Sequence, residues 1–420
     1  MAILPRIKIL FTYLGVWLLV VTSAFGAAPM RLSLEQAIEM GLERNLDLTA
    51  KREELGIAEG RVIRANLFLQ RNPELDGDVS NRRLKKPEDG SNRNIPQGGA
   101  SITQEFEIGG QPSYRREAAQ RNFEKVKFEV GDFGRLLRFR ITELFLKVLS
   151  TRTKIQQSQQ VVDLRNRLYE AAKTRLHAGD IPEVQLTTTE FEFNRARSDL
   201  ITLQREYEEL LYRLKTELFV EDDRDIELTG SLTRVSPPRL SLSELLKAAL
   251  ERRPDLAALE REAKAAEAEE RLTRAERIPN IRVGPFYERD DKDNIFGGKI
   301  SIPLPIFDRK QGELREALAR KTRANINYLN LRQSIEKAVR SAYARFALSE
   351  KELSLYSDET LKKFDDSLEL YQKAYQERQI DLPELILFQN QVIEARLKFL
   401  DTLTNYNLSL AELKLQAGIE

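Results

Sequence analysis

The chain has 420 residues, of which 32% are charged, and its 67 lysines and arginines nearly balance its 66 aspartates and glutamates. This balance argues against nucleic acid as a partner. The absence of cysteine excludes disulfides, thiolate metal sites, a cysteine nucleophile and a lipidated N-terminal cysteine.

Residues 1–26 have the layout of a secretory signal peptide. Arg6 and Lys8 precede an apolar run over residues 9–21, and small residues follow up to Gly26. The alternative is an uncleaved membrane anchor, for which the apolar run is short. No later segment approaches the roughly 18 consecutive apolar residues of a membrane-spanning helix.

Residues 27–226 form a first repeat. It opens with LSLEQAIEMGLERNLDL at 32–48, where Ser33 and Gln36 have capping-box spacing. Short helices are expected to about residue 69. A strand hairpin is predicted over 72–110 and a long helical hairpin over 113–219, with its turn in HAGDIPEV.

After a linker, residues 227–238, a second repeat at 239–420 follows the same order. Its opening, LSLSELLKAALERRPDL at 240–256, shares eight positions with the first copy. A strand hairpin is predicted over 279–307. A long helical hairpin is predicted over 309–417, turning in RQIDLPEL.

The long helical stretches are the most unusual feature of the sequence. Proline is absent from about Ser113 to Leu176 and from about Arg309 to Gln379, so each stretch is predicted to be one helix of about 100 Å. Apolar residues with 3-4 spacing predict coiled-coil seams. The seam residues are Val161, Leu164, Leu168 and Ala171 in the first stretch, and Leu361, Phe364, Leu368, Tyr371 and Tyr375 in the second.

The strand segments have the length of tilted membrane strands, although a soluble hairpin in each half is the alternative. Four strands cannot close a hollow barrel, and an open edge in lipid leaves backbone groups unpaired. Three chains would supply about twelve strands. The predicted fold class is mainly α with a small β part, in which duplicated long α-helical hairpins and four strands per chain form a trimeric α-barrel/β-barrel tube.

The duplicated opening, the joints EFEIGGQPSYRREAA and PLPIFDRKQGELREA, and the hairpin turns resemble the TolC-like outer-membrane efflux proteins. The FEIGGQ joint is most similar to the heavy-metal branch, the CzcC/CusC-like channels. The resemblance implies a homotrimer in the outer membrane with a long periplasmic extension. It also implies a periplasmic adaptor (membrane fusion protein) and an inner-membrane efflux transporter as partners, in a tripartite pump that moves substrates, with metal cations as one candidate, out of the periplasm.

Two pairs of acids lie at the predicted hairpin turns: Asp180 with Glu183, and Asp381 with Glu384. In a trimer they would repeat as carboxylate rings, which attract cations and repel one another. They are therefore candidates for a periplasmic gate or adaptor contact. The alternative is that they cap the returning helices. The resemblance places Glu384 on the gate-acid position of the family, whereas its second acid position falls near Leu387, and the second turn lacks the usual glycine.

No catalytic, cofactor or metal site is predicted, and an enzyme is not expected. His177 is the sole histidine, and Met1, Met30 and Met40 form no soft-metal ladder. GGKIS at 297–301 lacks the glycine and hydroxyl residue of a phosphate loop. The alternative functions are an exported periplasmic coiled-coil adaptor or scaffold protein. Metal cations, drugs and organic anions all remain open as cargo.

Overall fold

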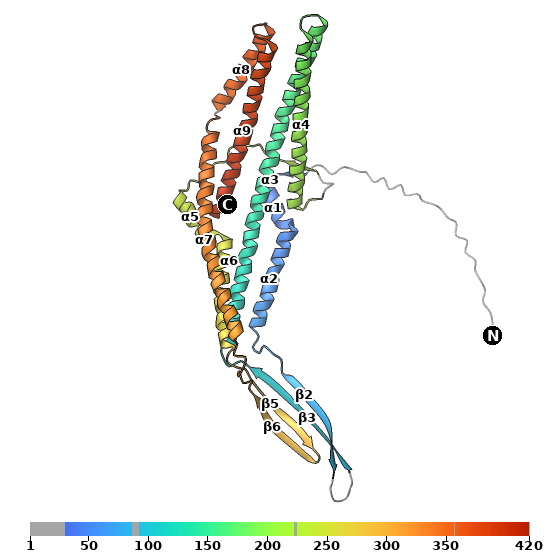
Figure 1. Cartoon of the computed structure of the whole chain (residues 1–420), viewed down its shortest axis with the longest axis vertical. Coiled ribbons are helices and arrows are strands. Elements are labelled where there is room, and N and C mark those ends of the chain that lie inside the picture. The colour runs from blue at the N-terminus through green and yellow to red at the C-terminus, as the bar shows by residue number, and fades with distance from the viewer. Residues whose placement is uncertain (1–29, 86–91, 222–224, 357, 420) are drawn as a thin grey trace, which may run out of the picture.

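The structure, a computed structural model, describes residues 30–85, 92–221, 225–356 and 358–419. The predicted signal peptide, residues 1–26, lies outside them. The described part is a long, narrow molecule with a sheet at one end and two helical turns at the other (Figure 1). This arrangement confirms the predicted fold class of a mainly helical, internally duplicated chain with a small β part.

Both halves contain the same series of elements. The first half consists of β1 (Met30–Leu32), α1 (Leu34–Arg44), α2 (Leu46–Ala65), β2 (Glu74–Lys85), β3 (Asn92–Phe106), α3 (Gln111–His177) and α4 (Glu183–Leu218). The second consists of β4 (Ile226–Leu228), α5 (Leu242–Arg252), α6 (Pro254–Ala275), β5 (Ile281–Asp290), β6 (Asp293–Ser301), α7 (Gln311–Leu353), α8 (Asp358–Gln376) and α9 (Leu382–Ala417).

The predicted capping boxes begin α1 and α5. The Ser33 and Ser241 side chains each accept a hydrogen bond from the backbone N–H three residues later, and the Gln36 and Glu244 side chains accept from the cap N–H groups. These reciprocal bonds satisfy amides that a helix start leaves unpaired. Each short helix therefore begins at a position fixed by its local sequence.

The four long strands form one antiparallel sheet in the order β2-β3-β5-β6. The pairing of β3 with β5, with Ser101 opposite Phe286, joins the two halves. At Gly284 a Cβ atom would lie 1.8 Å from the carbonyl oxygen of Ile102, so only glycine allows the strands to approach so closely. Within the described residues, β2 and β6 are the sheet's two unpaired edges.

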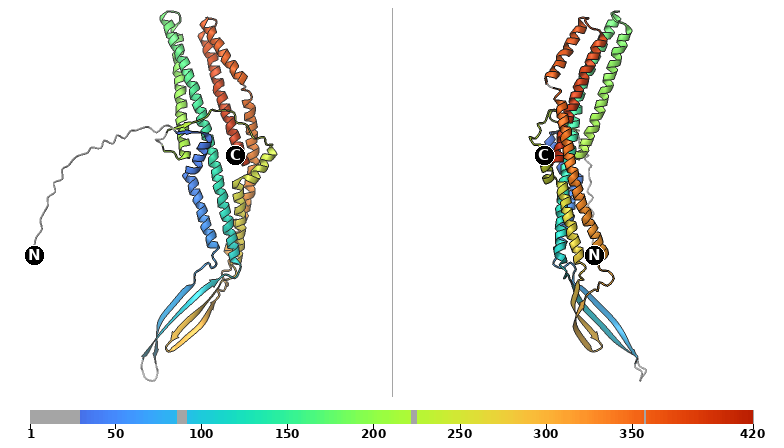
Figure 2. Two further views of the ribbon diagram at one scale, coloured as in Figure 1. Left: turned by 180° about the vertical axis from the view of Figure 1, so that it is seen from behind. Right: turned by 60° about the vertical axis from the view of Figure 1, so that its left-hand side comes forward.

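A second, small sheet lies at the waist of the molecule, about midway along its length (Figure 2). Strand β1 pairs in parallel with β4, Met30 opposite Ile226 and Leu32 opposite Leu228. Leu32, Ile226 and Leu228 are buried there against α3 and α4 in the core of the first half. The second half has its own core among α5, α7 and α9, centred on Tyr406.

Helix α3 is the single continuous helix of 67 residues that the sequence predicts. It packs against α4 and α2 of its own half and against α6 and α9 of the other. The first helical hairpin is therefore attached to the second along most of its length. None of the described helices is both long and apolar enough to cross a membrane.

The prediction of an equally continuous second helix is wrong. Helix α7 ends at Leu353 and α8 begins at Asp358. No proline or glycine marks this interruption. Instead, the Ser354 hydroxyl donates to the carbonyl oxygen of Lys351 at 2.6 Å, a local bond of the kind that competes with helical backbone pairing.

The predicted seam of α3 is displaced by one residue near the tip. Ala171 is exposed, and the buried positions are Ser158, Arg165 and Ala172, spaced seven residues apart. Small and polar side chains occupy these positions because the second hairpin also packs on this face of α3. In α8 the predicted residues Phe364, Leu368, Tyr371 and Tyr375 are half-buried, and the side chain of Leu361 lies outside the described part.

Candidate functional site at the helical tips

The turns that join α3 to α4 and α8 to α9 lie together at the end of the molecule farthest from the long strands (Figure 1). Both are Schellman turns. In the first, the N–H of Asp180 donates to the carbonyl of Arg175 at 2.9 Å; in the second, that of Gln379 donates to Ala374 at 2.8 Å. The tips therefore have the same backbone design.

The left-handed residue of each turn differs. Gly179 has a φ of 78° in the first turn, and Arg378 has a φ of 63° at the equivalent position of the second. A side chain in this conformation costs about 1–2 kcal/mol, which glycine avoids. The second turn, which lacks the usual glycine, thus keeps the conformation at an energetic cost.

The four candidate carboxylates occupy different positions in the two turns. Asp381 is the N-cap of α9, and its side chain accepts a hydrogen bond from the N–H of Glu384 at 3.0 Å. The N-cap of α4 is Pro182, which offers no side-chain cap. Asp180 instead matches Gln379, so the Asp-apolar-Pro segments are offset by two residues between the turns.

All four carboxylates are exposed. Among the described residues, the side chains of Asp180, Glu183 and Glu384 have no hydrogen-bond or ion-pair partner, so no nearby cation neutralises them. Leu387, at the second acid position of the resembling family, has 60% of its surface exposed. The capping alternative thus holds for Asp381, and a gating role for the four acids stays a prediction.

A first contact links the two tips to each other. A guanidinium N–H of Arg175, in the last turn of α3, donates to the Tyr375 hydroxyl of α8 at 3.1 Å. The same guanidinium lies 5.8 Å from the centre of the Tyr375 ring, within the range of a cation–π interaction.

A second contact lies deeper between the hairpins, at Arg165 of α3. Its guanidinium donates to the Gln389 and Asn390 side-chain oxygens of α9, each at 2.7 Å, and Glu192 of α4 lies 4.0 Å away. The Arg165 side chain is only 2% exposed. Burial lowers the pKa of Arg165, and the charge of Glu192 acts in the opposite direction.

Sequence reasoning did not identify Arg165 or Arg175 as functional candidates. The available signal is the position of Arg165, seven residues from both Ser158 and Ala172 on the buried face of α3. A charged residue on such a face requires a partner in the interior. That partner is on the other hairpin, more than 200 residues away in the sequence.

Across the part of the chain that the structure describes, no group of three His, Cys, Asp or Glu side chains is placed to hold a metal ion. The arrangement at the tips is therefore one of exposed charge on two bridged helical hairpins.

Comparison with known proteins decides the family. The sequence profile of the family described as "Outer membrane efflux protein" matches residues 37–218 and 245–418, most of both repeats. The chain belongs to the outer membrane efflux protein family. The alternatives of a periplasmic adaptor or a scaffold protein are therefore wrong.

Among individual relatives, this outer membrane efflux protein is 25% identical over 376 residues to the cobalt-zinc-cadmium resistance protein CzcC of Cupriavidus metallidurans, covering 89% of this chain and 86% of CzcC. Its fold is similar to that of CusC, with a TM-score of 0.75, 19% identity and 92% of each chain covered. It is also similar to the open-state MtrE channel of Neisseria gonorrhoeae, with a TM-score of 0.74, 19% identity and coverage of 92% and 89%.

Membership of this family gives the molecule its orientation. The protein is in the outer membrane, and its long helical hairpins form the periplasmic extension. The turns at 178–182 and 377–381 consequently lie at the periplasmic end, where material enters.

Proposed function

We propose that three copies of this chain form one tube, which serves as the outer-membrane channel of a tripartite efflux pump. The observation that carries this proposal is the pair of unpaired strands, β2 and β6, at opposite edges of the sheet. Unpaired backbone groups cost several kcal/mol each in lipid. Pairing β6 of one copy with β2 of the next removes both edges when the ring closes.

The helices support the same closure. Helices α2, α3, α6 and α7 pack in that order, which leaves α2 and α7 at the two edges below the waist. Both edge helices expose large apolar side chains: Ile57 and Ile63 on α2 are 62% and 63% exposed, and Ile326 and Leu329 on α7 are 58% and 54% exposed. Contact between α7 and the next copy's α2 would bury these side chains.

The tip carboxylates supply the proposed gate. In a threefold ring, Asp381 and Glu384 would contribute six carboxylates, and Asp180 and Glu183 six more. Like charges a few ångströms apart repel by about 1–4 kcal/mol per pair at surface-like dielectrics. Such rings attract cations and strain the closed tip, while the contacts of Arg165 and Arg175 between hairpins oppose its opening.

We further propose a periplasmic adaptor and an inner-membrane transporter as partners, and divalent metal cations as cargo. The cargo proposal rests on the similarity to CzcC, whose name states cobalt, zinc and cadmium resistance. The proposed role is passage without catalysis or a resident cofactor. Loss of resistance to these metals after deletion of the gene, and its return with the intact gene, would support this cargo.

Two measurements test the channel itself. The mass of the purified protein in detergent should correspond to three chains, and a stable monomer would contradict the tube. In planar bilayers, Asp381→Ala with Glu384→Ala should lower cation selectivity and weaken block by trivalent cations. Unchanged selectivity and block would show that these acids are not the gate.

A further inference from the structure

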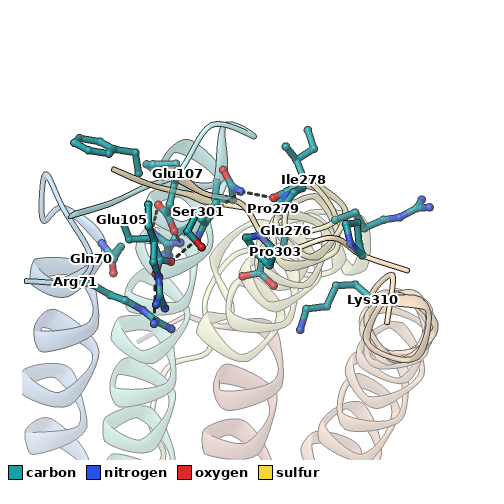
Figure 3. A pocket seen from close by; sticks show the side chains of 18 of the residues that line it. Gln70, Arg71, Glu105, Glu107, Glu276, Ile278, Pro279, Ser301, Pro303 and Lys310 are labelled. Carbon is teal, nitrogen blue, oxygen red and sulfur yellow. Dashed lines mark hydrogen bonds and ion pairs between the residues drawn. The ribbon is translucent and has the colours of Figure 1, made fainter. Parts of the chain in front are cut away.

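The junction between strands and helices contains a cavity of about 1030 Å³. Three of its arginines are paired with acids: Arg71 and Arg282 lie 3.4 and 3.3 Å from Glu105, and Arg115 forms two hydrogen bonds with Glu107. Arg277 and Arg309 also line this cavity. Figure 3 shows Arg71 beside Glu105, with Lys310, the N-cap residue of α7, across the cavity. Four carboxylates line this cavity, so its positive charge is partly neutralised.

An adjoining groove of about 640 Å³ differs in its charge. It lies between the end of α6, the segment after β6 and the first turns of α7. Three arginines line it, Arg277, Arg309 and Arg315, and no carboxylate in the described part of the chain does so. All three arginine residues are exposed.

The groove arginines also lack acidic partners elsewhere. Among the described residues, the side chains of Arg277 and Arg315 form no hydrogen bond or ion pair. Arg309 donates only a long bond, 3.4 Å, to the carbonyl oxygen of Ile306. Three arginines without an ion-pair partner in the described part of the chain thus line one groove, while Glu276 and Asp308 line the adjoining cavity.

The remaining wall of the groove is apolar. Phe307 is 90% exposed, Ile306 59% and Leu318 37%. The one other polar side chain lining the groove, Gln311, already bonds to the N–H of Arg309 and the carbonyl of Phe307. Exposed apolar side chains beside unpaired arginines match a ligand with an anionic head and a hydrocarbon tail.

We infer that this groove binds an anionic phospholipid, with the phosphate on Arg277, Arg309 and Arg315 and an acyl chain along Ile306, Phe307 and Leu318. Arginine binds phosphate through paired N–H donors, and basic side chains at a membrane surface favour anionic lipids. A free phosphate would leave the apolar wall exposed to water. The inference rests on the proposed function, because that function places the strands in the membrane and this junction at its surface.

The test is native mass spectrometry of the purified full-length protein in detergent, titrated with dioleoyl phosphatidylglycerol or dioleoyl phosphatidylcholine. The wild type should prefer the anionic lipid. Arg277→Gln, Arg309→Gln and Arg315→Gln together should reduce that preference about tenfold or more. Arg323→Gln, Arg332→Gln and Arg340→Gln form the matched control, because these α7 arginines are also exposed and have no described partner; this control should retain the preference.

Three outcomes would overturn the inference. The first is equal lipid preference in the groove variant and the wild type. The second is competition by glycerol 1-phosphate as effective as that of the whole lipid, which would mean that the apolar wall is unused. The third is dissociation of the groove variant into monomers, which would make the arginines contacts for a second copy. If the lipid preference fails this test while the measured mass still corresponds to three chains, the lipid site is excluded but the proposed channel is not.

Discussion

Asp381 and Glu384 lie on one turn of α9, but their surroundings separate two roles. Asp381 caps the helix, whereas the Glu384 side chain is exposed and has no described partner. Asparagine caps a helix about as well as aspartate but has no charge. Asp381→Asn should therefore keep the fold of the tip and lower cation selectivity in bilayer recordings.

Asp381→Ala removes both the cap and the charge. We expect it to cost about 1 kcal/mol more in unfolding free energy than Asp381→Asn, measured by thermal unfolding of the detergent complex. If the asparagine variant keeps wild-type selectivity while the alanine variant loses it, selectivity follows the helix cap and not the charge.

Arg165 holds the two hairpins together in this structure. Each hydrogen bond to a charged group contributes about 1.5–3 kcal/mol, so Arg165→Met should release Gln389 and Asn390 and favour an opened tip. Single-channel conductance should rise several-fold, with partial restoration in Arg165→Lys, which keeps the charge but loses the two-pronged geometry. Conductance equal to that of the wild type in Arg165→Met would exclude this role.

The edge helices α2 and α7 expose apolar residues that a second copy would cover. Ile57→Asp on α2 or Leu329→Asp on α7 would bury an unpaired charge at that contact, so the fraction of trimer in detergent should fall substantially. Ile201→Asp on α4 is the control, since Ile201 is 62% exposed like Ile57 but lies above the waist. An equal loss of trimer in all three variants would contradict the assigned contact.

Among helices and strands, the sequence predicts those features, such as helix starts, that depend on residues close together in the chain. The helix starts at Ser33 and Ser241 follow from capping boxes, and the long helix α3 follows from an uninterrupted helical pattern. The end of α7 at Leu353 was not predictable from proline or glycine. The contact of Arg165 with Gln389 depends on how two hairpins distant in sequence lie together, which local patterns do not determine.

Over the whole molecule, ion pairs at the waist join the two repeats. Arg135 of α3 donates to the carbonyl oxygen of Leu415 at 2.7 Å and lies 3.8 Å from Asp255, which also pairs with Arg253. Burial opposes ionisation of Asp255, but its hydrogen bonds with Arg253 and the charges of Arg253 and Arg135 lower its pKa below the ordinary 3.8.

A lowered carboxyl pKa stabilises the folded state above the ordinary value, and this stabilisation disappears as the pH falls through the folded-state pKa. Asp255→Asn should therefore lower the thermal midpoint of the complex at pH 7 but have little effect well below pH 3.8. The measurement is the thermal midpoint of the wild type and of Asp255→Asn at several pH values from 7 to well below 3.8. A difference that persists unchanged in acid would assign the effect to packing.

We expect the helical hairpins to tilt about the waist if the tip opens. Helices α4 and α9 each have 36 residues, so each rises about 54 Å from the waist to the tip. A tilt of about 10° at the pivot displaces the far end by about 9 Å at this length. Under this expectation, small changes in side-chain packing around Arg135 and Asp255 would change the width of the opening at the tips, far from any residue that lines it.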